Sequence, residues 1–229
     1  MSDLAPPRAT ELPEELERIY AARFGETRHY RNEVWKVLIG AFFQRWVPAD
    51  AAVLDLGCGY GEFINNVRCA AKYGMDLNPD ARRFLSPDVT LLEQDCSARW
   101  RLEDESLDVV FTSNFFEHLP DKRSLARTLA EAHRCLRRGG RLIALGPNVK
   151  FLPGQYWDFF DHYLPLTELS LAEGLRTSGF DVVRSEPRFL PYTMVNAPRY
   201  PLVFLRAYLA LPLAWRVLGR QFLVVAAKP

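Results

Sequence analysis

Four short apolar runs in this chain each lead into a small polar residue, and they recur at nearly equal intervals. The polar residues are Asp55, Asp76, Asp95 and Asn114, at spacings of 21, 19 and 19 residues. An interval of about 20 residues accommodates one buried strand and one helix-length crossover. Repeated units of this kind bury their strands on both faces, so the sequence predicts an α/β fold with a doubly wound parallel sheet.

Apolar runs bounded by turn residues predict the individual strands. The expected strands are residues 52–56, 71–75, 89–93, 107–112, 141–145, 180–185 and 221–227. An amphipathic helix is expected from its N-cap Asp121 to a basic and glycine-rich stop signal at residues 137–140, and another over residues 167–178. One domain is expected, with these parts: a helical cap (1–47), a cofactor-binding core (48–186), an apolar basic insertion (187–219) and the final strand (220–229).

Charge is distributed unevenly along the chain. The net charge is +1, which gives no overall attraction to nucleic acid, and no nucleic-acid partner is expected. From residue 187 to the last residue there are five arginines, one lysine and no acid. This stretch also holds the most apolar run, residues 200–219, but Arg206, Pro212 and Arg216 make it a poor membrane span. We expect a packed helix, a homodimer contact, or a surface for an anionic or lipid-bearing acceptor with peripheral membrane contact.

The cysteines indicate the redox setting. Cys58, Cys69, Cys96 and Cys135 include no CxxC pair, which excludes a zinc ribbon or a thioredoxin-like motif. Residues 1–18 are rich in Pro and Glu, unlike a signal peptide. The expectation is a cytoplasmic protein with free thiols.

The glycine-rich loop after the first strand carries the strongest chemical signal. Glycines at residues 57, 59 and 61 let the backbone turn tightly and approach a ligand closely. Asp76 follows the second strand, where nucleotide-binding folds place an acid against ribose hydroxyls. In a dinucleotide fingerprint a third small residue would stand at Glu62. Asp55 and Glu62 would repel a pyrophosphate but attract the sulfonium and ammonium of S-adenosylmethionine, which is therefore favoured over NAD.

Several segments resemble the motifs of the class I S-adenosylmethionine-dependent methyltransferase family, of the type 11/23 kind. Residues 53–61 (VLDLGCGYG) resemble motif I, residues 73–79 (YGMDLNP) the ribose-binding segment, and residues 94–96 (QDC) the segment that meets adenine. Residues 108–114 (DVVFTSN) and 136–142 (LRRGGRL) resemble the fourth-strand and fifth-strand motifs. The resemblance extends over residues 51–147 and weakens beyond them.

This resemblance implies a Rossmann-like sheet of seven strands with the last one antiparallel, and S-adenosyl-L-methionine as the cofactor. It implies that the glycine loop passes under the methionine moiety and that Asp55 lies near the methionine ammonium. It further implies that Asp76 holds the ribose and Asp95 the adenine amino group. The expected cofactor-binding residues are Asp55, Gly57, Gly59, Gly61, Asp76, Leu77, Asp95, Cys96 and Asn114.

The acceptor site is expected beside two acid–histidine pairs, residues 117–118 after the fourth strand and residues 161–162 after the fifth. A hydroxyl acceptor must lose a proton, so His162, or failing that His118, is the expected catalytic base. The two pairs resemble metal-holding segments of small-RNA 2′-O-methyltransferases and ubiquinone-pathway O-methyltransferases. Asn114 stands where those families often have a glutamate, so no metal is expected here. Alternatively, His118 caps a turn and His162 packs a lid.

The function predicted from these residues is O-methylation of a small-molecule, glycan or lipid-linked acceptor. N- or C-methylation, which needs no strong base, is the alternative among enzymes. A module that binds the cofactor without turnover is the alternative from another class.

Overall fold

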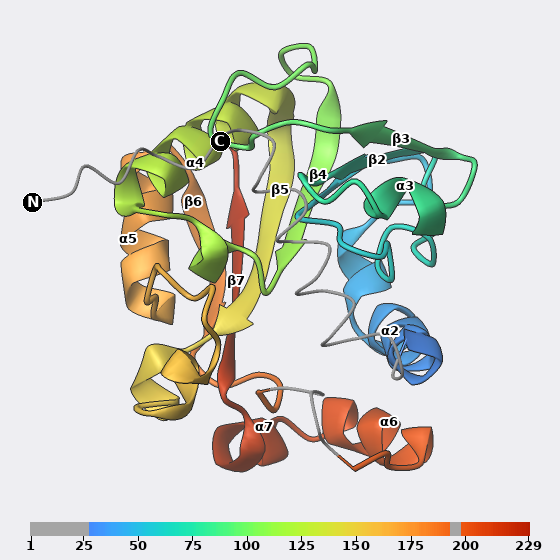
Figure 1. Ribbon diagram of the computed structural model, residues 1–229, viewed down its shortest axis with the longest axis vertical. Helices are drawn as coiled ribbons and strands as arrows, with labels where there is room; N and C mark the ends of the chain where they lie inside the picture. Colours follow the sequence, from blue (N-terminus) through green and yellow to red (C-terminus); the bar gives the residue numbers. More distant parts are fainter. Residues whose placement is uncertain (1–27, 193–197) are drawn as a thin grey trace, which may run out of the picture.

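One seven-stranded sheet organises the computed structural model, which describes residues 28–192 and 198–229 (Figure 1). The strand order is β3-β2-β1-β4-β5-β7-β6, and β7 runs antiparallel to both of its neighbours. The remaining pairs, β1 with β2 and β4, β2 with β3, and β4 with β5, are parallel. The predicted α/β sheet with an antiparallel last strand is confirmed. The strands are β1 (Ala52–Leu56), β2 (Ala71–Met75), β3 (Val89–Leu92), β4 (Leu107–Ser113), β5 (Leu136–Pro147), β6 (Asp181–Glu186) and β7 (Gln221–Ala227).

Helices cover both faces of this sheet. They are α2 (Arg28–Ala41), α3 (Ala81–Phe84), α4 (Lys122–Cys135), α5 (Glu168–Thr177), α6 (Leu202–Ala210) and α7 (Pro212–Leu218). Short 3₁₀ turns are η1 (Phe43–Trp46), η2 (Phe116–His118), η3 (Val149–Phe151) and η4 (Gln155–Asp158). Of the predicted cap, residues 1–27 lie outside the described residues, and α2 with η1 forms the rest.

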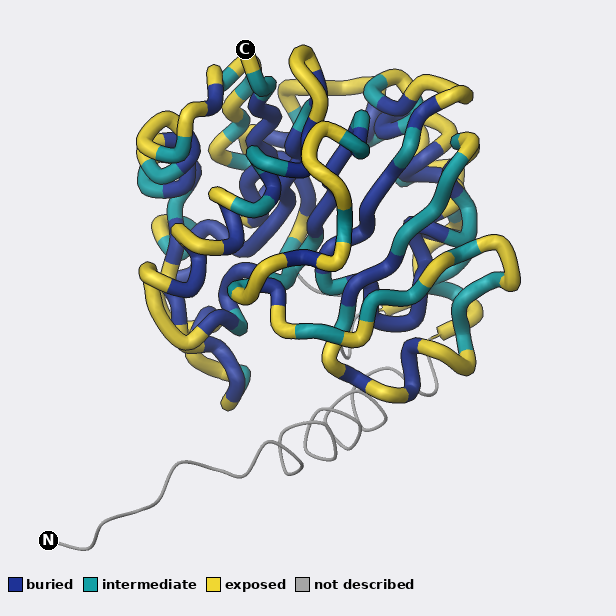
Figure 2. The backbone as a smooth tube through the Cα atoms, turned by 90° about the horizontal axis from the view of Figure 1, so that it is seen from above, coloured by how far each residue is buried: buried dark blue, intermediate teal, exposed yellow. Residues whose placement is uncertain are grey.

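Alternate residues of the central strands enter two separate cores. Leu54 and Val110 pack in a cluster with residues of α4 and α5. Their neighbours Val53 and Val109 pack in another cluster with residues of α2, α6 and α7. Both faces of β1 and β4 are therefore buried, and the strands lie in the dark interior of the molecule in Figure 2. Burial on both faces explains why these strands are continuous apolar runs in the sequence.

The end of α4 differs from the sequence prediction. The helix ends at Cys135, and β5 begins directly at Leu136. The predicted glycine stop at residues 137–140 is wrong, because these residues are the first part of a strand. Leu136 pairs with Leu107, and Gly139 donates a hydrogen bond to the carbonyl of Lys228 (2.7 Å). Pairing with neighbouring strands thus overrides a local signal for helix termination.

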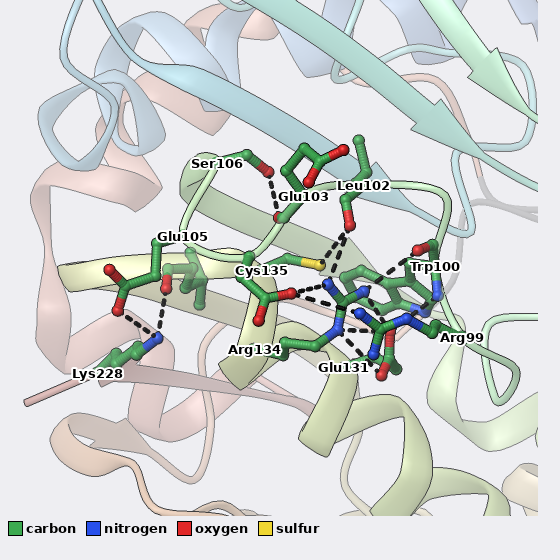
Figure 3. Close-up of polar contacts among 12 residues, drawn as sticks. Arg99, Trp100, Leu102, Glu103, Glu105, Ser106, Glu131, Arg134, Cys135 and Lys228 are labelled. Atoms are coloured by element: carbon green, nitrogen blue, oxygen red, sulfur yellow. Dashed lines mark hydrogen bonds and ion pairs between the residues drawn. The ribbon is translucent and has the colours of Figure 1, made fainter.

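Arg134 anchors the end of the sheet at which the parallel strands begin (Figure 3). Its guanidinium pairs with Glu131 (2.6 Å) and with Asp104 (2.6 Å). It also donates to the carbonyl oxygens of Trp100 (3.2 Å) and Leu102 (3.0 Å). The hydrogen bond to Glu131 is the main reason that the pKa of Arg134 lies above its usual range. This network fixes the loop at residues 99–106 on α4, and it stands at the end opposite to the candidate site described below.

The predicted insertion forms two short helices, α6 and α7, which are separated at Pro212. Leu209 and Trp215 anchor them in the same core as α2. Tyr30 of α2 also donates a hydrogen bond to the carbonyl of Tyr200 (3.0 Å). Across residues 28–192 and 198–229, neither these helices nor any other could reach through a bilayer's apolar interior.

Candidate functional site

A cavity of about 610 Å³ lies at the carboxyl ends of β1, β4 and β5. Its walls come from the glycine loop, from the turn after β4, from the aromatic segment near Phe159, and from α2 and α6. Ligands of open α/β sheets bind outside the carboxyl ends of the strands, next to the point where the strand order reverses. In this sheet that point lies between β1 and β4, so the cavity is the candidate site.

The cavity brings together about half of the residues that the sequence singled out. Its lining includes Asp55, Gly57, Gly59, Asn114, His118 and His162. It does not include Gly61, Asp76, Leu77, Asp95 and Cys96. Leu77 and Asp95 are exposed, whereas the Cys96 thiol is buried against the hydroxyl of Thr128 (3.4 Å). The cofactor roles of these residues stay predictions.

The glycine loop needs glycine for reasons visible in its geometry. Gly57 and Gly61 have φ values of +73° and +74°, in the left-handed region that side chains disfavour. A Cβ on Gly57 would lie 2.3 Å from the ring of Phe115. The amides of Gly57 and Cys58 both donate to the carbonyl of Met75 (2.8 and 3.1 Å), which fixes the loop on the end of β2.

The carboxylate of Asp76 is hydrogen-bonded to the backbone of this loop. It accepts hydrogen bonds from the backbone amides of Gly59 (2.7 Å) and Asn78 (2.8 Å). Burial raises the pKa of Asp76, although these amides act in the opposite direction. The amide of Leu77 acts on the carboxylate in the same way, and a carboxylate with about four acceptor positions still has capacity for a ligand. The sequence predicted a ligand contact for Asp76 but not this second, structural contact with the loop.

Two acids, Asp55 and Glu62, and one arginine, Arg31, set the charge of the cavity wall next to the glycine loop, which we call the inner wall. Burial, reinforced by the charge of Glu62, holds the pKa of Asp55 well above its usual range. Glu62 in turn pairs with Arg31 of α2 at 3.0 Å. From the sequence, Glu62 is expected to act on a ligand as a free charge, and no pattern indicates its partner Arg31, which lies 31 residues earlier in the cap. With Glu62 paired, Asp55 is the acid that a bound cation would stabilise most.

Asn114 has a local role at the end of β4. It is a non-glycine residue with a positive φ of +49°, a conformation that asparagine tolerates better than most residues. Its backbone amide donates to the carbonyl of Leu145 (2.9 Å), and its side chain donates to the hydroxyl of Ser113 (3.0 Å). The residue turns the chain from β4 into the segment that carries Glu117 and His118.

The two candidate histidines meet at the cavity wall. Their ring centroids are 5.1 Å apart. His118 Nδ1 lies 2.8 Å from the carbonyl oxygen of Asp161 and 3.2 Å from its carboxylate, while His162 Nδ1 lies 2.9 Å from the carbonyl of Tyr156. Because a carbonyl can only accept, we assign the proton to Nδ1 in both rings. Each Nε2 then carries the lone pair that a base or a metal ligand needs.

The charges around His118 favour proton transfer near neutral pH. Burial alone would lower the pKa of His118, but the hydrogen bond to Asp161 and the nearby charge of Glu117 outweigh it, so the pKa is raised. Burial raises the pKa of Glu117 to about 7. Glu117 therefore titrates near neutral pH, and its charge and that of Asp161 favour the protonated form of His118.

Glu117, His118 and His162 could also hold a metal ion. Each offers one ligand atom, and these atoms lie within 4.8 Å of one another. Imidazole and carboxylate suit divalent transition metals, and a carboxylate behind a ligating histidine, as Asp161 lies behind His118, orients such a ligand. The expectation of a metal-free site stays a prediction.

The comparisons with known proteins concern the part of the chain that carries these residues. Residues 54–144 match the family model described as a methyltransferase domain. A curated relative of Mycobacterium tuberculosis, named a probable S-adenosylmethionine-dependent methyltransferase, is 33% identical over 121 residues, which is 49% of this chain and 43% of the relative. The chain therefore aligns with less than half of the relative's length.

Solved structures extend the likeness over most of the chain. A S-adenosylmethionine-dependent methyltransferase from Archaeoglobus fulgidus superposes with a TM-score of 0.65 at 21% identity, covering 90% of this chain and 99% of that one. Another from Mesorhizobium loti gives a TM-score of 0.59 at 18% identity, covering 84% and 98%. At these identities the structural likeness shows a shared fold.

Proposed function

We propose that this chain, whose residues 54–144 belong to the methyltransferase-domain family, transfers a methyl group from S-adenosylmethionine to a hydroxyl group of a small-molecule, glycan or lipid-linked acceptor. The observation that carries the proposal is that one cavity holds the glycine loop, the buried Asp55 and the pair His118 and His162. An acid that can hold a cation and a histidine that can accept a proton, both around one space, support methyl transfer to a hydroxyl group.

The residues of the inner wall fit the cofactor. Asp55 would hold the methionine ammonium, and a bound cation would offset the burial that raises its pKa. The absence of a Cβ at Gly57 makes room for the ring of Phe115 and allows the tight turn of the loop, which would pass under the methionine moiety. Asp76 would hold the ribose and Asp95 the adenine amino group. When bound, the cofactor supplies an activated methyl group.

The chain's own residues would prepare the acceptor. His162 Nε2 would accept the hydroxyl proton while its Nδ1–H stays on the carbonyl of Tyr156, which fixes the ring. His118 is held in the same way by Asp161, whose carboxylate would stabilise a protonated ring. Trp35 and Phe111 line the cavity and would limit water around the reacting atoms, and methyl transfer itself depends mainly on positioning.

Product analysis tests this proposal against its alternatives. The protein is incubated with S-adenosylmethionine and matched acceptors that differ only in a hydroxyl or an amino group, and S-adenosylhomocysteine release is measured. The proposal expects turnover with hydroxyl acceptors. Turnover with amines only would assign N-methylation. Tight cofactor binding without turnover on any acceptor would favour a binding module.

The pH profile should report the environment of His118. His118 is the alternative base to His162. A base must be unprotonated, so where His118 accepts the proton, kcat/KM rises with pH through its pKa, which is raised above the usual value of about 6.5. Asp161→Asn removes the carboxylate charge that raises this pKa, so the rise should move to lower pH. Asp158→Asn, which changes an exposed acid of η4, is the control. An identical profile in all three proteins would show that His118 does not set the pH dependence.

We also propose a reducing, cytoplasmic setting. Cys58, Cys69, Cys96 and Cys135 are all free thiols, and Cys58, Cys96 and Cys135 are buried. Proteins of oxidising compartments more often pair their cysteines in disulfides.

A further inference from the structure

Helix α6 is apolar on its inner and its outer side. Leu205, Tyr208 and Leu209 pack inward with the core that contains α2. Val203 and Phe204 lie outside this packed side, with exposed fractions of 63% and 62%, and Phe204 is at the edge of the cavity. Apart from Arg206, α6 carries apolar side chains beyond its packed side, and a helix of this kind normally buries them against a partner or in a lipid phase. The exposed apolar side chains of α6 therefore indicate contact with a partner or a lipid.

The next helix enlarges this surface. Leu213 and Val217 of α7 are 74% and 68% exposed, whereas Trp215 between them is buried and holds the helix in place. Figure 1 shows α6 and α7 next to each other below the sheet, on the side toward which the arrow of β5 points. Single exposed apolar residues are ordinary, but a group on adjoining helices marks an interaction site. We call this group the α6–α7 patch; it consists of Tyr200, Val203, Phe204, Leu211, Leu213, Val217 and Leu218.

The charge around the patch selects the type of partner. Arg206 and Arg216 are exposed on the same two helices, and neither forms an ion pair with any residue that the structure describes. From residue 187 onward the sequence contains six basic residues and no acid. Arginine beside exposed apolar side chains suits the boundary of an anionic bilayer, where apolar groups enter the acyl region and guanidinium groups bind phosphates.

A second copy of the chain is a poorer occupant. In a twofold dimer the same patch would face itself, and its arginines would meet arginines with no acid of residues 198–229 to pair with them. Like charges placed against each other across an interface oppose association. The charge pattern therefore favours a lipid surface over self-association.

The patch is continuous with the cavity of the candidate site. Tyr200, Phe204 and Leu218 belong to the patch and also line the cavity. His118 and His162 line the same cavity. A molecule held at the patch by an apolar chain would therefore have its polar end within reach of the two histidines.

We propose that the α6–α7 patch docks on an anionic lipid bilayer, and that the acceptor is a lipid-linked molecule that enters the cavity from this bilayer. The docking stands on the patch and its charges, and the identity of the acceptor rests on the function proposed above. In the docked state, Val203, Phe204 and Leu213 lie at the level of the lipid headgroups, and Arg206 and Arg216 bind lipid phosphates.

Vesicle sedimentation of the full chain tests the docking. The protein is mixed with vesicles of phosphatidylcholine alone or with added phosphatidylglycerol, at low and at physiological salt. Pelleting is expected with the anionic vesicles only, and it should weaken as salt increases. Arg206→Glu with Arg216→Glu should weaken the partition coefficient by at least about 30-fold, since each basic residue near an anionic bilayer contributes about 1 kcal/mol. Val203→Ser with Leu213→Ser should also weaken the partition coefficient, because it removes two apolar side chains that would enter the bilayer. Both residues are exposed, so the variant should fold like the wild type.

Arg101→Glu with Arg138→Glu is the matched control. It makes the same charge change with two exposed arginines far from the patch, near the ends at which the parallel strands begin, and should pellet like the wild type. Equal and negligible pelleting of all the proteins would overturn the docking. A lipid-free dimer that Val203→Ser with Leu213→Ser dissociates would assign the patch to a second copy instead.

These outcomes are separable from the proposed function. The sedimentation assay contains neither S-adenosylmethionine nor an acceptor, so a failure of methyl transfer leaves its result unchanged. Conversely, a protein that turns over water-soluble acceptors at full rate without binding vesicles would keep the function and lose the docking.

Discussion

Replacing His118 and His162 together by alanine should slow methyl transfer to a hydroxyl acceptor by about 10²–10⁴-fold, the contribution of a general base. Both rings line the cavity, and both are oriented by main-chain carbonyls that leave Nε2 as the acceptor nitrogen. The single variants show which ring acts, and we expect His162→Ala to account for most of the loss. Cofactor affinity should not change, because neither ring belongs to the predicted cofactor-binding set.

The control for this prediction is His29→Ala, which removes an exposed histidine of α2 that does not line the cavity. Full rate at neutral pH in the double variant would show that another group, or bulk water, takes the proton. Treatment with a chelator distinguishes a metal site from a metal-free general base. Loss of activity that a divalent cation restores would identify Glu117, His118 and His162 as metal ligands, in disagreement with the metal-free site predicted here.

Asp76→Ala should weaken the binding of S-adenosylmethionine by about 10²–10⁴-fold. A pair of charge-assisted hydrogen bonds contributes about 1.5–3 kcal/mol for each bond, and the predicted pair joins Asp76 to the ribose. The same substitution also frees the amide of Gly59, which the carboxylate now holds at 2.7 Å. Calorimetric titration measures the loss.

Asp76→Asn separates the two contributions of this residue. It keeps one acceptor oxygen for the loop but removes the charge and one acceptor, so its affinity should lie between those of the wild type and Asp76→Ala. Asp158→Ala removes an exposed carboxylate and should bind like the wild type. Unchanged affinity in Asp76→Ala would show that Asp76 does not bind the ribose.

The sheet could be predicted because each central strand is buried on both faces. Val53 and Leu54, for example, enter different cores, and the sequence therefore shows an uninterrupted apolar run. The same kind of reasoning failed at the end of α4. Leu136 leaves the helix to pair with Leu107, and no local pattern shows a partner that lies 29 residues earlier.

The site was predictable where its chemistry follows single strands, and not where it depends on distant partners. The glycine loop and the two histidines, which line the cavity, each follow a recognisable strand. The pairing of Glu62 with Arg31 joins the core to a helix of the cap, and the fixing of His118 by Asp161 joins two loops. The part of the cavity wall that α6 contributes could not be predicted either, because an apolar run alone does not show which of its sides faces inward.

Calorimetric titration of the wild-type protein with S-adenosylmethionine and with NAD tests the central claim most directly. A cationic ligand should ionise the buried Asp55 and pair with it, an interaction that a pyrophosphate cannot make. We expect one binding site per chain for S-adenosylmethionine, with a micromolar dissociation constant, and no measurable heat with NAD. Saturable binding of NAD, with no binding of S-adenosylmethionine, would contradict this claim.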